Sequence, residues 1–139
     1  MATRSRIAIE NEDGTVTSIY CHFDGYVEHN GKILQEHYSD RSKVEQLIAL
    51  GDISYLRKNI EPTGKHSFNE PEDDVTVAYH RDRGEKLNQI THNWGVEGFF
   101  THNFEEYGYC FTKEGKWLVA HCSGGAVQDL ELALKGIEI

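Results

Sequence analysis

The sequence lacks any long hydrophobic run. None of its 139 residues belong to a stretch approaching the roughly 20 consecutive apolar residues that a membrane-spanning helix needs. The first residues, MATRSRIAIENEDG, also lack the apolar segment of a secretory signal, because charged residues interrupt them. We therefore expect a cytoplasmic protein with no membrane partner.

Cysteine is scarce, and its spacing matches no metal or redox motif. Cys21, Cys110 and Cys122 form no C-x-x-C pair, and an odd number does not suit a disulfide framework. We expect three free, buried thiols with a structural role. Glycine-containing stretches such as GYVEHNG and HCSGGA lack the spacing of a phosphate-binding loop, so no cofactor is expected.

Positive charge is also in deficit. The chain has 14 Lys and Arg against 23 Asp and Glu, a formal net charge of −9. Such a surface repels phosphates at long range, which argues against direct binding of nucleic acid. An acidic surface can instead imitate DNA and occupy a nucleic-acid-binding protein, and this alternative stays open. Its candidate residues are Glu70, Glu72, Asp73 and Asp74.

Bulky aromatic residues are plentiful by comparison. The chain contains 6 Phe, 7 Tyr and 2 Trp, enough to anchor a packed core. Its length falls within the usual size of one domain, and two separate cores would be hard to build from it. We expect residues 1–139 to form a single globular domain.

Two antiparallel hairpins are predicted from alternating apolar and polar residues. In RIAIENEDGTVTSIYCHF, a three-residue loop over residues 12–14 sets Ile7 opposite Ile19, so that the apolar residues share one face. A four-residue loop would divide them between the faces. In YGYCFTKEGKWLVAHC, the same type of loop sets Phe111 opposite Trp117.

The residues between the hairpins are mostly helical in pattern. Three segments have apolar residues at helical spacing: 33–38, 40–50 and 53–60. Residues 61–74 hold both prolines and many acidic residues, which predicts an exposed, flexible loop. VTVAYHRDR, residues 75–83, then predicts a strand. Residues 85–104 give only weak helical signals, and residues 126–139 predict a closing helix.

This order of elements predicts an α+β fold. We expect an antiparallel sheet of about five strands, formed by two hairpins and a central strand, with the helices packed on one face. The last hairpin carries a wide aromatic face, larger than one short helix covers, which predicts a homo-oligomer, at least a dimer. That face consists of Tyr107, Tyr109, Phe111 and Trp117.

Arginines and aromatic residues supply the candidate binding surface. The hairpin parity places Tyr20 and His22 on the face opposite the core, together with Arg4 and Arg6. Arginine pairs beside planar rings suit a nucleotide-like anion, whereas a solvated face with salt bridges is the plainer alternative. The ligand-binding candidates are Arg4, Arg6, Tyr20, His22, Asp24, Tyr26, Arg81, Arg83 and Trp94, the pair Arg81 and Arg83 sharing one face of the strand predicted at 75–83.

A second interpretation is a small hydrolase or metal-dependent enzyme centred on His22 and Asp24. With His29 they form an H-x-D-x4-H series that could supply metal ligands, although an aspartate at a strand end also favours a simple turn. No nucleophile is paired with a base, since Cys21 lies on the other face from His22, so no catalytic residue and no metal ligand is assigned. The parity predicts His22 and Asp24 at the rim of a cleft on the face opposite the helices.

Part of the chain resembles a known group of proteins. The run TRSRIAIENEDGTVTSIYCHFDGYVEHNGKILQEHY, followed by KVEQLIALGDISYL, is similar to a family of small uncharacterised bacteriophage and prophage proteins over about residues 3–56. The resemblance implies a phage accessory protein made in a bacterial host cytoplasm, where countering host defence is a common task. We expect a stoichiometric binder rather than an enzyme, one that sequesters a nucleotide-derived small molecule or inhibits a host defence protein.

Overall fold

A central hairpin organises the fold. The computed structural model describes residues 3–103, 105–122 and 126–137, and the parts of the sequence predictions that fall on other residues lie outside these ranges. Strands β1 (Ser5–Glu10) and β2 (Val16–Cys21) pair antiparallel with Ile7 opposite Ile19, as predicted from the alternation. Gly14 ends the three-residue loop with φ of 87°, a left-handed conformation that glycine adopts at little cost.

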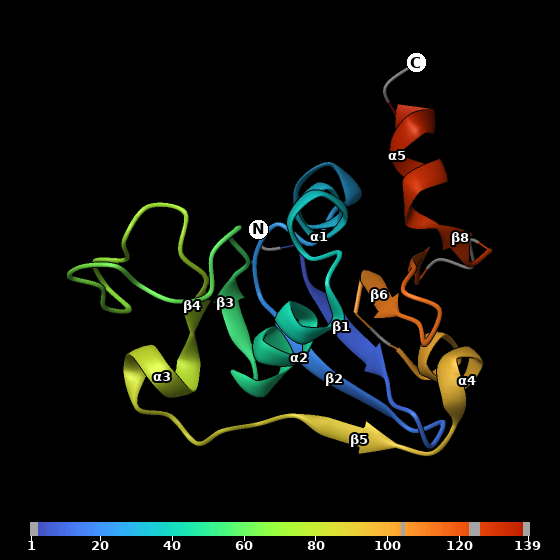
Figure 1. Cartoon of the computed structure of the whole chain (residues 1–139), viewed down its shortest axis with the longest axis horizontal. Coiled ribbons are helices and arrows are strands. Elements are labelled where there is room, and N and C mark those ends of the chain that lie inside the picture. Colours follow the sequence, from blue (N-terminus) through green and yellow to red (C-terminus); the bar gives the residue numbers. More distant parts are fainter. Residues whose placement is uncertain (1–2, 104, 123–125, 138–139) are drawn as a thin grey trace.

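The sheet extends from this hairpin on both sides (Figure 1). The strands follow the order β4-β3-β2-β1-β6-β7-β8, and β5 pairs with the other end of β2. The remaining strands are β3 (Ile53–Tyr55), β4 (Val77–Ala78), β5 (Ile90–His92), β6 (Tyr107–Phe111), β7 (Trp117–His121) and β8 (Gln128–Asp129). The described residues thus form an eight-stranded sheet rather than one of about five strands.

The pairing is mixed, although most of it is antiparallel. The second hairpin is confirmed, since β6 and β7 pair with Phe111 opposite Trp117. Two neighbouring pairs are parallel, however: β1 with β6, and β2 with β3. The sequence prediction of an antiparallel sheet was wrong for these pairs. Their strands lie far apart in the chain, so no hairpin loop indicates in which direction they pair.

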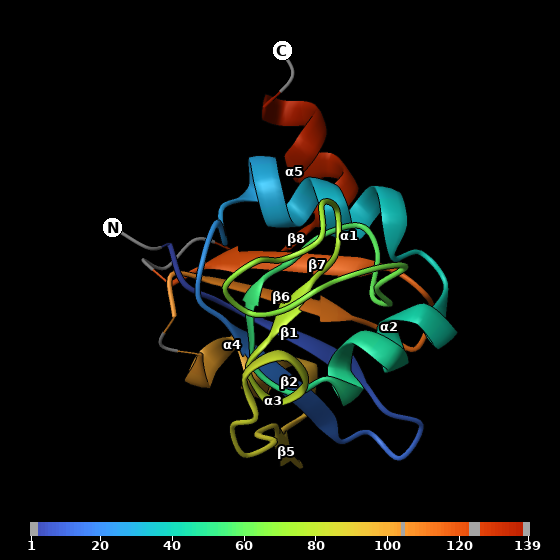
Figure 2. The same ribbon diagram turned by 90° about the vertical axis from the view of Figure 1, so that its left-hand side faces the viewer.

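Helices cover both faces of the sheet, not one. Helix α1 (Lys32–His37), the preceding π-helix η1 (Val27–Gly31), α2 (Arg41–Ala49) and the closing α5 (Leu130–Ile137) pack on the face of Ile7 and Ile19. Helix α4 (Gly95–His102) packs on the opposite face, against Ala8 and Val16 (Figure 2). The sequence missed this arrangement because residues 85–104 carry no clear periodicity.

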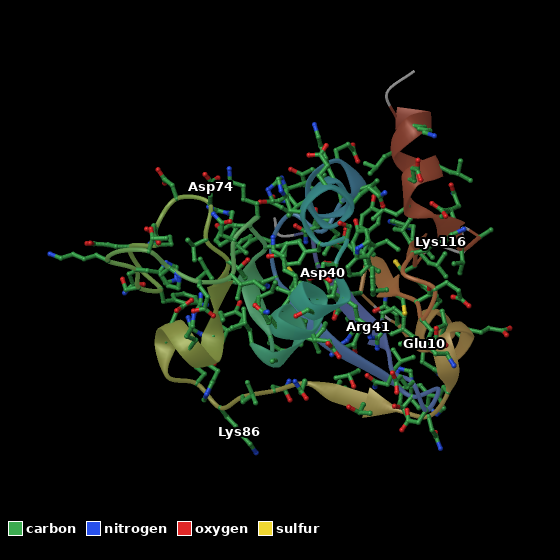
Figure 3. All side chains as sticks on the ribbon, in the orientation of Figure 1. Glu10, Asp40, Arg41, Asp74, Lys86 and Lys116 are labelled. Atoms are coloured by element: carbon green, nitrogen blue, oxygen red, sulfur yellow. The ribbon has the colours of Figure 1, made fainter. Side chains whose placement is uncertain are left out.

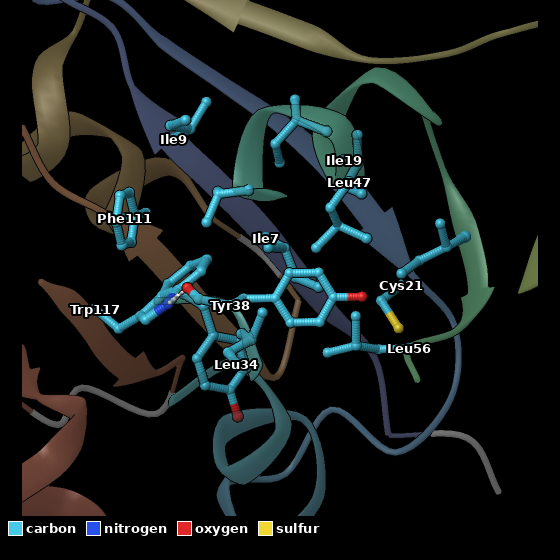
Figure 4. Close-up of a cluster of buried hydrophobic side chains, with 14 of the residues drawn as sticks. Ile7, Ile9, Ile19, Cys21, Leu34, Tyr38, Leu47, Leu56, Phe111 and Trp117 are labelled. Carbon is cyan, nitrogen blue, oxygen red and sulfur yellow. Dashed lines mark hydrogen bonds between the residues drawn. The ribbon is translucent and has the colours of Figure 1, made fainter. Parts of the chain in front are cut away.

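The main core lies between the sheet and α1, α2 and α5 (Figure 4). Tyr38 and Trp117 are both buried there, and the indole Nε1–H of Trp117 donates to the carbonyl oxygen of Tyr38 at 2.8 Å. The Tyr38 hydroxyl in turn donates to the carbonyl oxygen of Arg57 at 2.7 Å. Each buried polar group of these rings therefore has a partner, which avoids the cost of about 1–3 kcal/mol for an unsatisfied one.

The burial of these aromatics removes the argument for an oligomer. Tyr109, Phe111 and Trp117 are almost fully buried within the main core, and Tyr107 is only half-buried. The predicted exposed aromatic face is therefore wrong, because η1, α1 and α5 together cover what one helix could not.

Two middle segments differ from their predicted form. Residues 53–60 were expected to be helical but begin with strand β3, because Ile53 pairs with Cys21 at the end of β2. Residues 75–83 were expected to be one strand, but β4 ends at Ala78 and helix α3 (Tyr79–Arg83) follows. The carboxylate of Asp82 accepts the backbone N–H of Ala78 at 2.8 Å and so holds the start of this short helix.

Helix α2 is tied to the central hairpin by a charged side chain. In Figure 3 Arg41 points from the start of α2 toward Glu10 at the end of β1. Its Nη2 donates to the carbonyl oxygen of Glu10 at 2.7 Å. Asp40 occupies the N-cap position of α2, although no side-chain capping bond is formed there.

Candidate cleft around Arg6

The face of the sheet opposite the main core carries the candidate site. Arg6 and Ala8 of β1 lie opposite Tyr20 and Ser18 of β2, and alternation places all four side chains on this face. Strand β5 extends the same face, since Ile90 pairs with Ser18. The sequence prediction of a polar face bearing Arg6 and Tyr20 is thus confirmed in its parity.

Helix α4 covers only part of this face. Phe99 packs with Ala8, Val16 and Cys110 in a second, smaller hydrophobic cluster. Gly108 of β6 allows close packing here, because a Cβ at that position would lie 2.7 Å from Nδ2 of Asn103. Arg6, on the same face, is half-buried, so the sheet surface around that residue is only partly covered.

The uncovered surface forms a cleft of about 250 Å³, which we call the Arg6 cleft. It lies between the sheet, β5 and the α4 region, which adjoin at one end of the molecule (Figure 1). Its lining residues are Arg6, Ser18, Ile90, His92, Trp94, Phe99, His102, Asn103 and Glu105. Arg6 and Trp94, two candidates from the sequence, therefore meet in one site.

Arg6 is held in place by Ser18. Its Nε donates to the Ser18 hydroxyl oxygen at 3.1 Å and its Nη2 donates to the Ser18 carbonyl oxygen at 3.3 Å. Burial lowers the pKa of Arg6, while the negative charges of Asp52 and Glu105 act in the opposite direction. A guanidinium has five N–H groups, so three remain after the bonds to Ser18, and no acceptor for them is seen among residues 3–103, 105–122 and 126–137.

Aromatic rings form the outer wall of the Arg6 cleft. The centroid of the Trp94 ring lies 4.5 Å from that of His92 and 4.3 Å from that of His102. Gly98 permits this arrangement, because a Cβ there would lie 2.2 Å from Cβ of Trp94. Burial lowers the pKa of His92, and His102 and Arg6 lower it further, which favours a neutral imidazole. Trp94 is nevertheless 55% exposed and accessible to a ligand.

The residues of the enzyme interpretation lie outside the cleft lining. The Tyr20 hydroxyl lies 2.7 Å from Nδ1 of His22, and Asp24 occupies a turn with φ of 58°. Tyr26 is exposed beside His29, with ring centroids 6.1 Å apart. Within the described part of the chain, no three His, Cys, Asp or Glu side chains are grouped as metal ligands. His22 and Asp24 do not line the Arg6 cleft. Their position at the rim of a cleft on the face opposite the helices stays a prediction.

Arg81 and Arg83 do not project together from a strand. Both belong to helix α3, where Arg81 pairs with Asp82 and donates to the carbonyl oxygens of Ile60 and Thr76 at 2.6 and 2.7 Å. Arg83 pairs with Glu85. Arg4 lies just before β1 and is exposed. The arginine pair at 81 and 83 therefore stabilises local structure, and neither residue lines the Arg6 cleft.

Hydrogen bonds and ion pairs hold the acidic loop at 61–74 in place. The His66 side chain is 2% exposed and lies 3.0 Å from the Asp82 carboxylate, while its Nδ1 accepts the backbone N–H of Glu72. Glu72 also accepts bonds from Thr63. Asp74 pairs with Lys58 at 3.6 Å. Two of the four acidic residues of the DNA-mimic alternative are thus engaged within the chain.

Two of the three thiols are buried, and none forms a disulfide. Cys21 and Cys110 lie inside, and burial raises their pKa to about 11 and about 12. Cys122 is exposed, so the prediction of three buried thiols was wrong there. It follows His121 at the end of β7, where the chain leaves the sheet.

The sequence did not identify most of the cleft. Ser18 could be found from hairpin parity, because it lies opposite Ala8 on the same face as Arg6. His92, His102 and Glu105 could not, since their placement depends on β5 joining β2 and on α4 crossing the sheet.

In comparisons with known proteins, no family model, no curated protein and no solved structure matches the chain. Among the helices that the structure describes, none has the length and apolar character needed to cross a membrane.

Proposed function

We propose that this chain is a phage accessory protein that counters host defence by stoichiometric binding of a nucleotide-derived small molecule in the Arg6 cleft. The observation that carries the proposal is the position of Arg6, a partly buried guanidinium with unused donors beneath a rim of aromatic rings. The resemblance of residues 3–56 to phage proteins supports the biological setting.

The chemistry of the cleft suits a planar ring with polar edges. Stacking of a base on an aromatic side chain contributes roughly 1–3 kcal/mol, and Trp94 and His92 offer such surfaces. The lowered pKa of Arg6 reflects water lost on burial, and a hydrogen-bond acceptor on the ligand would replace that water.

The size of the cleft favours one ring system. At about 250 Å³ it lies just below the roughly 300–1,000 Å³ of sites that enclose drug-sized ligands. A base would fit inside, and the rest of a nucleotide would remain at the opening.

Binding without chemistry is supported by the lining residues. Ser18 supplies the hydroxyl of the cleft, and its oxygen accepts a bond from Arg6. In the described residues no histidine is hydrogen-bonded to this oxygen, so the paired nucleophile and base of a hydrolase are not assembled there.

Native mass spectrometry of the protein recovered from bacterial lysate tests the proposal. We expect the wild-type chain to carry the extra mass of one small molecule per subunit, and Arg6→Met and Trp94→Ala to lose it. Arg83→Met is the matched control, because it removes the same charge from a half-exposed side chain outside the cleft. A wild-type chain that carries no small molecule would contradict the proposal, and one that carries a host protein instead would favour inhibition of that protein.

A further inference from the structure

The Arg6 cleft contains two opposite charges. Arg6 comes from β1 within the sheet, whereas Glu105 lies just before β6 (Tyr107–Phe111). Both line the same small volume. Burial lowers the pKa of Arg6, and the negative charge of Glu105 raises it. The two groups are therefore close enough to interact electrostatically.

These charges do not neutralise each other by contact. Among the ion pairs of residues 3–103, 105–122 and 126–137, none joins Arg6 to Glu105 within 4.0 Å. Donors therefore face the cleft from one residue and acceptors from the other. A molecule that enters between them must present an acceptor to Arg6 and donors to Glu105.

Glu105 is held in position by local contacts. Its backbone N–H donates to Oδ1 of Asn103 at 3.2 Å, and Asn103 itself also lines the cleft. Gly108 leaves the space that the Asn103 amide occupies. The carboxylate is thus anchored through its backbone to an element that packs against the sheet.

We infer that the Arg6 cleft selects a guanine-type ring, with its carbonyl oxygen toward Arg6 and its ring N–H and exocyclic amine toward Glu105; this inference rests on the binding function proposed above. A carboxylate can accept two adjacent N–H groups at once, which matches this edge of guanine. Adenine presents one amine beside an unprotonated ring nitrogen, whose lone pair would face the carboxylate.

The phosphate of such a ligand belongs outside the cleft. Glu105 would repel it inside, whereas Arg4, which lies just before β1 and two residues from Arg6, is exposed. Burial raises the pKa of Tyr20, while the charge of Arg4 lowers this pKa and that of Glu105 raises it, so Tyr20 lies near both charges. A nucleotide whose base occupies the cleft would therefore have its phosphate beside Arg4.

Titration of Trp94 fluorescence with three nucleotides tests the inference. The probes are guanosine, inosine and adenosine 5′-monophosphate, where inosine lacks the exocyclic amine. We expect guanosine monophosphate to bind about tenfold or more tightly than adenosine monophosphate, as one bond to a charged group supplies. Inosine monophosphate should fall between them.

Substitution of the carboxylate provides the second arm. Glu105→Gln should reduce the guanosine preference about tenfold, whereas the neighbouring Glu106→Gln, exposed and outside the lining, should retain it. If Glu105→Gln does not fold, as judged by circular dichroism, the three-nucleotide comparison on the wild-type chain decides alone.

The outcomes separate the inference from the proposed function. Equal binding of the three nucleotides, with loss of all of it in Arg6→Met, would overturn the guanine preference while leaving the binding function in place. If the wild-type chain binds none of the three nucleotides, both the guanine preference and the proposed binding of nucleotides are overturned.

Discussion

The guanidinium of Arg6 donates to both the hydroxyl and the carbonyl oxygen of Ser18, its diagonal neighbour across the first hairpin. Ser18 is 2% exposed, so these bonds form on the inner side of the cleft. They orient the guanidinium without using all of its donors. An arginine fixed in this way loses less side-chain entropy when a ligand binds.

We therefore expect Ser18→Ala to weaken ligand binding. Without the hydroxyl oxygen, Arg6 is free to turn, and we predict about a tenfold loss of affinity for guanosine monophosphate with a drop of about 1 kcal/mol in the free energy of unfolding. Calorimetric titration and urea unfolding measure the two effects. Thr91→Ala is the matched control, because it removes an exposed hydroxyl that bonds Thr17. Wild-type affinity in Ser18→Ala would show that the orientation of Arg6 is unimportant.

The two arginines of α3 should differ strongly in their effect on stability. Arg81→Ala removes bonds to two backbone carbonyls and to the Asp82 carboxylate, whose side chain is 4% exposed. We expect a loss of about 2–4 kcal/mol in the free energy of unfolding. Arg83→Ala breaks a half-exposed pair with Glu85 and should cost less than about 1 kcal/mol. Equal losses in urea unfolding would contradict these assignments.

Stability should fall in acid through Asp82. Burial opposes ionisation of this carboxyl, but hydrogen bonds from Arg81, the Ala78 backbone N–H and His66 outweigh it and lower the pKa below the ordinary 3.8. A carboxyl with a lower pKa in the folded chain binds protons more readily when unfolded. Its stabilising effect is therefore complete above about pH 4 and is lost as the pH falls through the folded pKa.

Asp82→Asn tests this pH dependence. We expect the variant to be less stable at pH 7 and to lose less stability than wild type between pH 5 and pH 3. Thermal unfolding across this range measures both. Asp73→Asn, at an exposed position, is the control. A wild-type pH profile in Asp82→Asn would assign the acid sensitivity to other carboxylates.

The cysteines should differ in reactivity. Cys21 and Cys110 are buried, with pKa raised to about 11 and about 12, so little thiolate forms at neutral pH. Cys122 is exposed. We expect iodoacetamide to modify one thiol in the native chain and three in urea, as counted by mass spectrometry, and Cys122→Ser to abolish the native reaction. Rapid native modification of Cys21 would contradict the packing of the main core.

The hairpins could be predicted from the sequence because both partners are local. A three-residue loop and the alternation around Ile7 and Ile19 leave one register that keeps the apolar residues together. The short α3 could not be predicted, since the alternation of residues 75–83 reads as a strand and only Asp82 binding back to Ala78 shows where the helix starts.

The candidate site was predictable to a smaller extent. Hairpin parity placed Arg6 on the face opposite the core, and Trp94 was a ligand-binding candidate because of its aromatic ring. Neither pattern showed that the two residues share a cleft. Their position in one cleft depends on β5 pairing with β2 and on α4 packing on the second face, which are long-range packing events. Glu105 carries no local signal at all, because its role depends on the position of Arg6 across the cleft.

Nuclear magnetic resonance of the two indole N–H groups and of the Arg6 Nε–H tests the central claim most directly. Trp94 lines the cleft, whereas Trp117 is buried and bonded to Tyr38 and so serves as an internal control. On addition of the four ribonucleoside 5′-monophosphates, or of a low-mass filtrate of bacterial lysate, we predict shifts of the Trp94 and Arg6 signals and no shift of Trp117. Unchanged Trp94 and Arg6 signals with both additions would contradict a small-molecule site in the Arg6 cleft.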